Sequence, residues 1–526
     1  MMDLTHYPYP SRRHVVLGRR GAVATSQPLA ALAGMETLWK GGSAVDAAIA
    51  MAACLTVVEP TSNGIGGDLF ALVFDGELHG LNASGKSPLA LTPEKLPEGR
   101  MPERGWLPVT VPGAVSGWRA LHERWGRLPF MEVLAPAIRH AEEGFPVGPE
   151  TARAWRRAEG VYLPLKAPEF QAFQEVFFPH GRAPRAGEVW RSPLHAKTLR
   201  EIGESYGESL YGGPLAEALA AFSGATGGLL TLEDLKAHAP EWVKPLATTY
   251  KGLTVHELPP NGQGVAVLLA LNILEGLDLR PEDPMGYHLQ IEAMRLALAD
   301  TYRFVADPRF MELAPEAFLS KAYAAERRRL IGERALPLAL PGLKPEGTVY
   351  LAAADGEVMV SLIQSNYQGF GSGILVPGTG IALQNRGLGF ALEEGHPNRV
   401  GPGKRPFHTI IPGFLTREGK PLGPFGVMGG FMQPQGHVQV VLGLADFGLN
   451  PQAALDRPRW QVVPGGEVLL EPGIPQATAL FLKDRGHRVR YEAEYGAFGR
   501  GQVILRLEEA LCAASDPRAE GLALAL

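Results

Sequence analysis

The feature that most limits how this chain can fold is a pair of strand-like runs in its C-terminal third. Residues 348–354 and 357–364 are each typical of β-strands, and Asp355-Gly356 separates them. Asp-Gly between two such runs is a strong signal for a β-hairpin with a two-residue turn. Because such a turn fixes the register, Thr348 is predicted to lie opposite position 363, with residues 364–366 beside it.

The composition is that of a chain with a large core. Gly (64) and Pro (45) make up about a fifth of the 526 residues, but 45% of the chain is hydrophobic. With 50 Lys+Arg against 55 Asp+Glu, the formal net charge is −5, and there is no basic tract. This balance argues against nucleic acid or an anionic membrane surface as the main partner.

Cysteine and histidine usage gives no sign of a metal site. The two cysteines, Cys54 and Cys512, cannot build a disulfide framework or a cysteine-based zinc site, and the 14 histidines show no convincing zinc-ligand spacing. We therefore expect no metal.

The N-terminal region has no apolar leader, and its most apolar stretch is Ala44–Val58. That stretch is shorter than the ~20 residues that a membrane span needs, and Ser43 before it is suited to cap a helix. The sequence therefore predicts a buried core helix here, and a cytoplasmic protein without a membrane partner.

Thr348 is a candidate nucleophile on one condition. A threonine hydroxyl reacts poorly unless a base takes its proton, and the α-amine of a threonine that begins a chain can be that base. This requires a break between Gly347 and Thr348, and glycine suits a strained scissile peptide. The alternative, which the spacing alone favours, is a structural threonine at the start of a strand.

Two glycine-rich stretches could present backbone N–H groups. Gly429-Gly430 follows the apolar run 425–428 and could stabilise an oxyanion, although on these residues alone a tight turn is the favoured interpretation. Gly64-Ile65-Gly66-Gly67 resembles a phosphate-binding loop, but it follows a helical stretch and precedes a strand. That order is the reverse of the dinucleotide fingerprint, so no nucleotide cofactor is expected.

Ordered motifs along nearly the whole chain resemble the γ-glutamyltranspeptidase (glutathione hydrolase) family of N-terminal-nucleophile hydrolases. The matching stretches are 42–48, 58–60, 64–67, 111–113, 144–147, 227–235, 370–373, 402–406 and 428–430, with Thr348 and Asp355. The resemblance implies an α+β fold, a four-layer αββα sandwich, and a precursor that cleaves itself before Thr348. Residues 1–347 would form a large subunit and residues 348–526 a small one, intertwined in one domain, and a dimer of such heterodimers stays open.

The resemblance also implies roles for particular residues. Thr348 matches the nucleophile, Gly429 and Gly430 match the oxyanion glycines, and Asn366 matches the asparagine that holds the substrate's α-amino end. The residues that we predict to bind substrate, at matching or neighbouring positions, are Asn366, Arg386, Thr409, His408, Lys86 and Gln364.

The acyl pocket departs from the family pattern in its charges. The family arginine that grips the glutamyl α-carboxylate is replaced by Ser84, which leaves Lys86 as the nearest cation. The aspartate that pairs the α-ammonium is replaced by Gly389, and a glutamine is replaced by Arg386. A pocket with an added cation and no anion suits a glutaryl group better than a zwitterionic γ-glutamyl group.

Three functions follow from these observations. The resemblance implies cleavage of γ-glutamyl amides such as glutathione, with water, an amino acid or a peptide accepting the acyl group and without any cofactor. The substituted pocket favours a glutaryl or cephalosporin-type acylase, and an unprocessed, non-enzymatic chain is the third reading. The segment between Phe390 and Lys404 is too short for the lid loop of some members, which favours hydrolysis over transfer.

Overall fold

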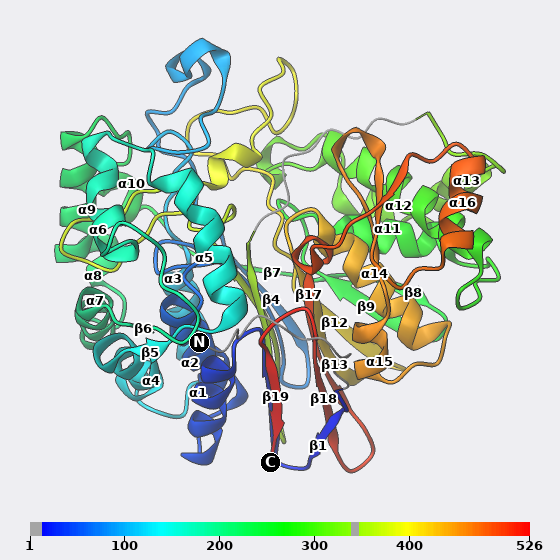
Figure 1. Ribbon diagram of the computed structural model, residues 1–526, viewed down its shortest axis with the longest axis horizontal. Coiled ribbons are helices and arrows are strands. Elements are labelled where there is room, and N and C mark those ends of the chain that lie inside the picture. Colours follow the sequence, from blue (N-terminus) through cyan, green and yellow to red (C-terminus); the bar gives the residue numbers. More distant parts are fainter. Residues whose placement is uncertain (1–12, 338–346) are drawn as a thin grey trace.

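The computed structural model describes residues 13–337 and 347–526, and in these residues two seven-stranded sheets pack face to face (Figure 1). The strands of sheet B are, in spatial order, β19 (Leu522–Ala525), β2 (Gly21–Thr25), β10 (Val349–Asp355), β11 (Met359–Ser365), β3 (Asp68–Phe74), β4 (Leu78–Ala83) and β7 (Glu241–Val243). Those of sheet A are β1 (Val16–Gly18), β18 (Leu511–Ser515), β17 (Arg500–Arg506), β13 (Lys420–Met428), β12 (Gly413–Arg417), β9 (Leu253–Glu257) and β8 (Leu246–Tyr250).

Helices cover the outer face of each sheet (Figure 1). The sheet B side carries α1 (Pro28–Trp39), α2 (Ala44–Val58), α3 (Ala114–Trp125), α4 (Phe130–Glu143), α5 (Pro149–Tyr162), α6 (Gln171–Phe177), α7 (Pro193–Glu204), α8 (Ser209–Gly212), α9 (Pro214–Ala225) and α10 (Leu232–Lys236). The sheet A side carries α11 (Gly264–Leu274), α12 (Pro284–Phe304), α13 (Lys321–Arg329), α14 (Met432–Ala445), α15 (Pro451–Asp456) and α16 (Gln476–Asp484). The predicted αββα sandwich is confirmed.

Short strands complete the fold. β14 (Trp460–Val462), β15 (Val468–Leu470) and β16 (Val489–Tyr491) form a small sheet, and β5 (Phe145–Pro146) pairs with β6 (Val189–Trp190). In the part of the chain that the structure describes, no helix is long and apolar enough to cross a membrane.

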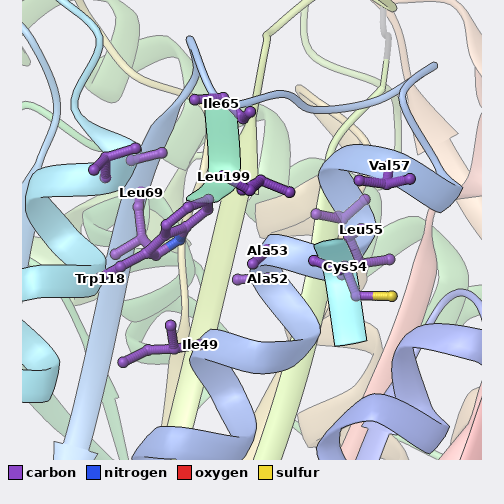
Figure 2. Packing of buried hydrophobic residues seen from close by; sticks show 14 of the residues in the cluster. Ile49, Ala52, Ala53, Cys54, Leu55, Val57, Ile65, Leu69, Trp118 and Leu199 are labelled. Carbon is purple, nitrogen blue, oxygen red and sulfur yellow. The ribbon is translucent and has the colours of Figure 1, made fainter. Parts of the chain in front are cut away.

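Helix α2 is buried along its whole length, as the sequence predicted. Ser43 caps it by accepting the Asp46 N–H, while the Asp46 carboxylate accepts the Ser43 N–H. Both backbone N–H groups of this capping box are therefore hydrogen-bonded. Figure 2 shows the apolar side chains of α2 beside Leu69 of β3 and Trp118 of α3. This packing fixes the strands of sheet B against the helical layer.

The β10–β11 hairpin exists, but its register differs from the prediction. Val349 pairs with Gln364, so Thr348 lies opposite Ser365 and not opposite position 363. The reason is the Asp355 carboxylate, which accepts the N–H groups of Glu357 and Val358. This local turn moves the two loop residues one position along the chain, to Gly356 and Glu357, and shifts every cross-strand pair by two.

Both sheets combine strands from either side of the Gly347–Thr348 bond. In sheet B, β10 and β11 lie between β2 and β3, and β19 adds to the β2 edge. In sheet A, β9 pairs with β12, which comes from the C-terminal part of the chain, and β8 pairs with β9. Thr348 therefore immediately precedes a central strand whose neighbours come from both parts of the chain.

Candidate active site

Three polar residues lie in a row across neighbouring strands of sheet B. Thr348 immediately precedes β10, Ser365 ends β11, and Asp68 begins β3. Ser365 pairs directly with Asp68, and Thr348 Oγ1 lies 3.0 Å from Ser365 Oγ. Because directly opposed residues of antiparallel strands project from the same face, the register brings these three side chains together.

The Ser365 hydroxyl connects the candidate nucleophile to the peptide bond before it. It accepts the Tyr367 N–H at 2.8 Å and the Arg386 Nη2–H at 3.2 Å, which fills both of its lone pairs. Its single proton is therefore donated, and the available acceptors are Gly347 O at 3.3 Å and Thr348 Oγ1 at 3.0 Å. Donation to the Gly347 carbonyl polarises the bond that self-cleavage would break.

Arg386 is the buried cation of the site. It begins a short 3-10 helix (Arg386–Gly389), and its Nη1 donates to Thr409 Oγ1 at 2.8 Å. Its guanidinium lies 4.1 Å from the centre of the Tyr367 ring, and Nε has no hydrogen-bond partner among the described residues. Burial lowers the pKa of Arg386 to about 10, so the group stays charged at neutral pH.

Asp68 supplies an anion that the sequence analysis did not foresee. Its Oδ2 accepts from His408 Nε2 at 2.9 Å and lies 3.9 Å from Arg386 Nε, while its Oδ1 accepts the Gly85 N–H. Burial raises the pKa of Asp68 to about 7, against the opposing effect of Arg386. Burial also holds the pKa of His408 well below its usual value, so this imidazole is neutral.

Gly429 and Gly430 connect the end of β13 to α14. Their φ values of +133° and +57° lie in the region that favours glycine, so both positions need a residue without Cβ. The Gln263 side chain joins this turn to Thr409, because its Nε2 donates both to Gly430 O at 2.9 Å and to Thr409 O at 2.7 Å. The predicted oxyanion glycines and the Arg386–Thr409 pair are thus held by one side chain.

A cavity of about 350 Å³ opens beside these groups. Gly347 and Gly429 line it, which places it next to the predicted scissile bond and the predicted oxyanion site. Its apolar wall includes Tyr162 and Met428, whereas Arg386 lies outside the wall.

Not every predicted site residue lies in the site. The Gln364 side chain points to the opposite face of β11, where it accepts from Trp118 Nε1 and donates to Asn63, because successive strand residues alternate faces. Lys86 lies beside Arg405 and Arg309 rather than Arg386, and burial together with these cations lowers its pKa. The structure therefore does not bring these two side chains together with Thr348 and Arg386, and their binding of substrate stays a prediction.

Asn366 lies close to the site but supports a loop. Its side chain packs against Gly64 and Gly67, and its Nδ2 donates to Phe370 O at 3.2 Å. Its Oδ1 is buried without a hydrogen-bond partner among the described residues. The role of Asn366 toward a substrate stays a prediction.

Gly389 has no room for the family's aspartate. A Cβ at this position would lie only 2.3 Å from the backbone carbonyl oxygen of Phe407. The anion of this site therefore comes from β3, through Asp68. Among the residues that the structure describes, no group of three or more His, Cys, Asp or Glu side chains is arranged to hold a metal ion.

Comparisons with known proteins identify the family of this chain. The profile of the Gamma-glutamyltranspeptidase family matches residues 30–526, so the chain belongs to this family of N-terminal-nucleophile hydrolases. It is 36% identical to the glutathione hydrolase-like YwrD proenzyme of Bacillus subtilis, over 97% of this chain and 99% of that relative. It is 34% identical to the oxamate amidohydrolase proenzyme of Klebsiella pneumoniae, over 96% and 98%.

A solved structure shows the same fold over the entire length. The crystal structure of cephalosporin acylase from Bacillus halodurans matches with a TM-score of 0.96 and 54% identity, covering 100% of this chain and 99% of that one. The family and fold predicted from the motifs are therefore confirmed.

Proposed function

We propose that this chain cleaves itself between Gly347 and Thr348 and then hydrolyses amides whose acyl half ends in a carboxylate. The observation that carries the proposal is the buried Arg386, whose guanidinium contacts the hydroxyl that touches Thr348 Oγ1. A charged donor that is separated from the nucleophile by a single hydroxyl group suits a short dicarboxylic acyl group such as glutaryl.

Self-cleavage starts from the contacts around Ser365. Thr348 Oγ1 attacks the Gly347 carbonyl carbon while the Ser365 proton stabilises the developing oxyanion. The C–N bond breaks as the proton of Thr348 Oγ1 passes to the Thr348 nitrogen, and the chain is then joined through an ester. Water hydrolyses that ester, which leaves a carboxylate on Gly347 and a free α-amine on Thr348.

Substrate turnover uses the new amine. It takes the Oγ1 proton as Oγ1 attacks the substrate carbonyl, and the N–H groups of Gly429 and Gly430 stabilise the tetrahedral oxyanion. The amine product leaves with a proton, and water then hydrolyses the acyl ester. Because the adjoining cavity opens beside the reacting groups, hydrolysis is favoured over transfer to an amino acid or peptide.

The relatives support a carboxylate-bearing acyl group. Oxamate is itself an amide whose acyl half ends in a carboxylate, and the oxamate amidohydrolase of Klebsiella pneumoniae shares 34% of aligned residues with this chain. The cephalosporin acylase of Bacillus halodurans, whose solved structure matches this chain, is a second amide-cleaving relative. Both agree with an acylase of the kind that Arg386 suggests.

Cleavage of γ-glutamyl amides is the second candidate, and Asp68 favours it. A γ-glutamyl group carries an ammonium beside its carboxylate, and Asp68 places an anion 3.9 Å from Arg386. However, Asp68 is buried, its raised pKa of about 7 leaves it only partly charged at neutral pH, and Arg386 already lies beside it. An ammonium left without a partner in this buried site would cost several kcal/mol, so we rank the glutaryl reading first.

Two measurements test the proposal. Purified full-length protein should separate into two bands on a denaturing gel, and N-terminal sequencing of the smaller band should begin at Thr348. Thr348→Ala should remain one band, whereas Thr348→Ser, which keeps a hydroxyl, should still split. Initial rates with glutaryl-4-nitroanilide and γ-glutamyl-4-nitroanilide, which differ by one ammonium, then decide between the two acyl groups. A strong preference for the γ-glutamyl compound would reject the first candidate, and a persistent single band would reject both.

A further inference from the structure

The cavity beside Gly347 has a strongly positive wall. Three arginines line it, Arg104, Arg157 and Arg500, against one carboxylate, Glu494. Arg157 forms an ion pair with Glu494, so the charge of this carboxylate is neutralised by Arg157. The other two cations have weaker counter-charges.

Arg500 begins β17 at the edge of the cavity. Its side chain is 11% exposed, and Nη1 donates to Glu59 Oε1 at 3.3 Å. Glu59 also accepts the Ser26 hydroxyl, and Glu520 is a second carboxylate that attracts Arg500. Burial raises the pKa of both carboxylates, which opposes the charged form of each. The positive charge of Arg500 is therefore only partly compensated.

Arg104 donates to neutral acceptors. Its Nη1 contacts Glu103 O at 2.9 Å and Gln368 Oε1 at 3.0 Å, and its guanidinium lies 5.0 Å from the centre of the Tyr162 ring. Its ion-pair partner is Glu103, whose Oε2 lies 3.9 Å from Arg104 Nη1 on a side chain that is 57% exposed. Solvent screens such an exposed charge, so Arg104 also retains a net attraction for an anion.

The position of the cavity identifies the half of the substrate that occupies it. Gly347 and Gly429 lie at its reacting end, while Arg386 lies outside its wall. A substrate with its carbonyl oxygen at the glycine turn and its acyl carboxylate on Arg386 extends its amine half into the cavity. This step rests on the proposed function.

We propose that this cavity is the leaving-amine site and that Arg104 and Arg500 select amines carrying a carboxylate. The wall formed by Tyr162, Val161 and Met428 adds contact for an apolar body. The preferred amine is therefore an aromatic or other apolar group that bears a carboxylate. Arginine recognises a carboxylate through paired, charge-assisted hydrogen bonds, which gives the site its specificity.

A matched pair of chromogenic substrates tests this. Glutaryl-4-nitroanilide and glutaryl-3-carboxy-4-nitroanilide share the acyl group and differ by one carboxylate on the amine. The wild-type protein should show a higher kcat/KM for the carboxylated compound, by roughly tenfold, which is the effect of one charge-assisted hydrogen bond. If glutaryl compounds are poor substrates, the corresponding γ-glutamyl pair makes the same comparison.

Variants then locate the preference. Arg500→Gln and Arg104→Gln should each lower the kcat/KM of the carboxylated substrate relative to that of the uncarboxylated one. The variant of the arginine that contributes more should lower this ratio roughly tenfold. Arg153→Gln is the control, because Arg153 lies on the same helix as Arg157 but is 44% exposed and pairs with Glu150 outside the cavity. Self-cleavage on a denaturing gel verifies that each variant folds.

An assay on the wild-type protein avoids the variants altogether. Free 5-amino-2-nitrobenzoate, the carboxylated amine, should inhibit at a lower concentration than 4-nitroaniline. Equal inhibition, or a kcat/KM ratio that both Arg variants leave unchanged, overturns the leaving-amine site. If the wild-type protein instead shows no Thr348-dependent hydrolysis of any of these substrates, the proposed function itself is overturned. The two failures are therefore distinguishable.

Discussion

Replacing Asp68 by Asn should remove a pH dependence from the acyl site. Asp68 lies 3.9 Å from Arg386, and burial raises its pKa to about 7. Below pH 7 the protonated Asp68 leaves the Arg386 charge uncompensated, and above pH 7 the carboxylate offsets it. A dicarboxylic ligand should therefore bind more weakly as the pH rises through about 7.

The magnitude follows from the charges. A ligand carboxylate on the far side of the guanidinium would lie roughly 7 Å from Asp68, where two unit charges repel by about 2.4 kcal/mol at an effective dielectric constant of about 20. That energy corresponds to roughly a 50-fold loss of affinity. Asparagine keeps an oxygen that accepts from His408 Nε2 and carries no charge at any pH, so it reproduces the protonated state.

The assay is competitive inhibition by glutarate, measured for wild type and Asp68→Asn between about pH 5.5 and pH 8.5. The wild-type Ki should rise over this range, and the variant Ki should stay nearly constant. Using the ratio of the two Ki values at each pH cancels ionisations that both proteins share. A wild-type Ki that does not change, or one that changes in parallel with the variant, would refute the coupling between Asp68 and Arg386.

Three further predictions follow from the same site. Ser365→Ala should slow self-cleavage roughly 100-fold, the usual effect of removing one oxyanion donor, whereas Ser365→Thr should retain most of the rate on a gel time course. Gly429→Ala should lower kcat by a similar factor, because φ of +133° strains any residue with a Cβ; an unchanged kcat would place the oxyanion elsewhere. The raised pKa of Asp68 means that its contribution to stability is complete below its unfolded pKa of 3.8 and is lost as the pH rises through about 7, by about 4 kcal/mol in total. The melting temperature of wild type should therefore fall relative to Asp68→Asn between about pH 5 and pH 8, and equal shifts would contradict this.

The sequence was sufficient for the architecture and for some of the site. Helix α2, with its Ser43 cap, is local, and its apolar composition and capping signal predict it directly. The motifs gave the αββα fold by resemblance. Arg386 and Thr409, both predicted to bind substrate, prove to be hydrogen-bonded to each other.

The errors concern register and non-local pairing. The Asp355 side chain, not the Asp-Gly pair as a unit, sets the turn, and the shift of two positions hid the contact between Thr348 and Ser365. Gln364 was assigned to the site because it is near in sequence, but the alternation of strand faces points it away. Asp68 was overlooked because it follows a glycine loop, and only the pairing of β3 with β11 brings it to Ser365.

The interleaved strands of the two sheets have a consequence for how the protein folds before cleavage and how it unfolds afterwards. Before a cut at Gly347–Thr348, unfolding and refolding involve one chain, and the ends of every loop remain tethered. After the cut, a molecule that unfolds becomes two fragments, and rebuilding β2-β10-β11-β3 requires them to meet again in solution. The entropy of that encounter makes recovery dependent on concentration, so folding has to precede cleavage. The stability of the mature enzyme would then depend on a slow rate of unfolding and not on a reversible folding equilibrium. Heat inactivation should therefore be largely irreversible.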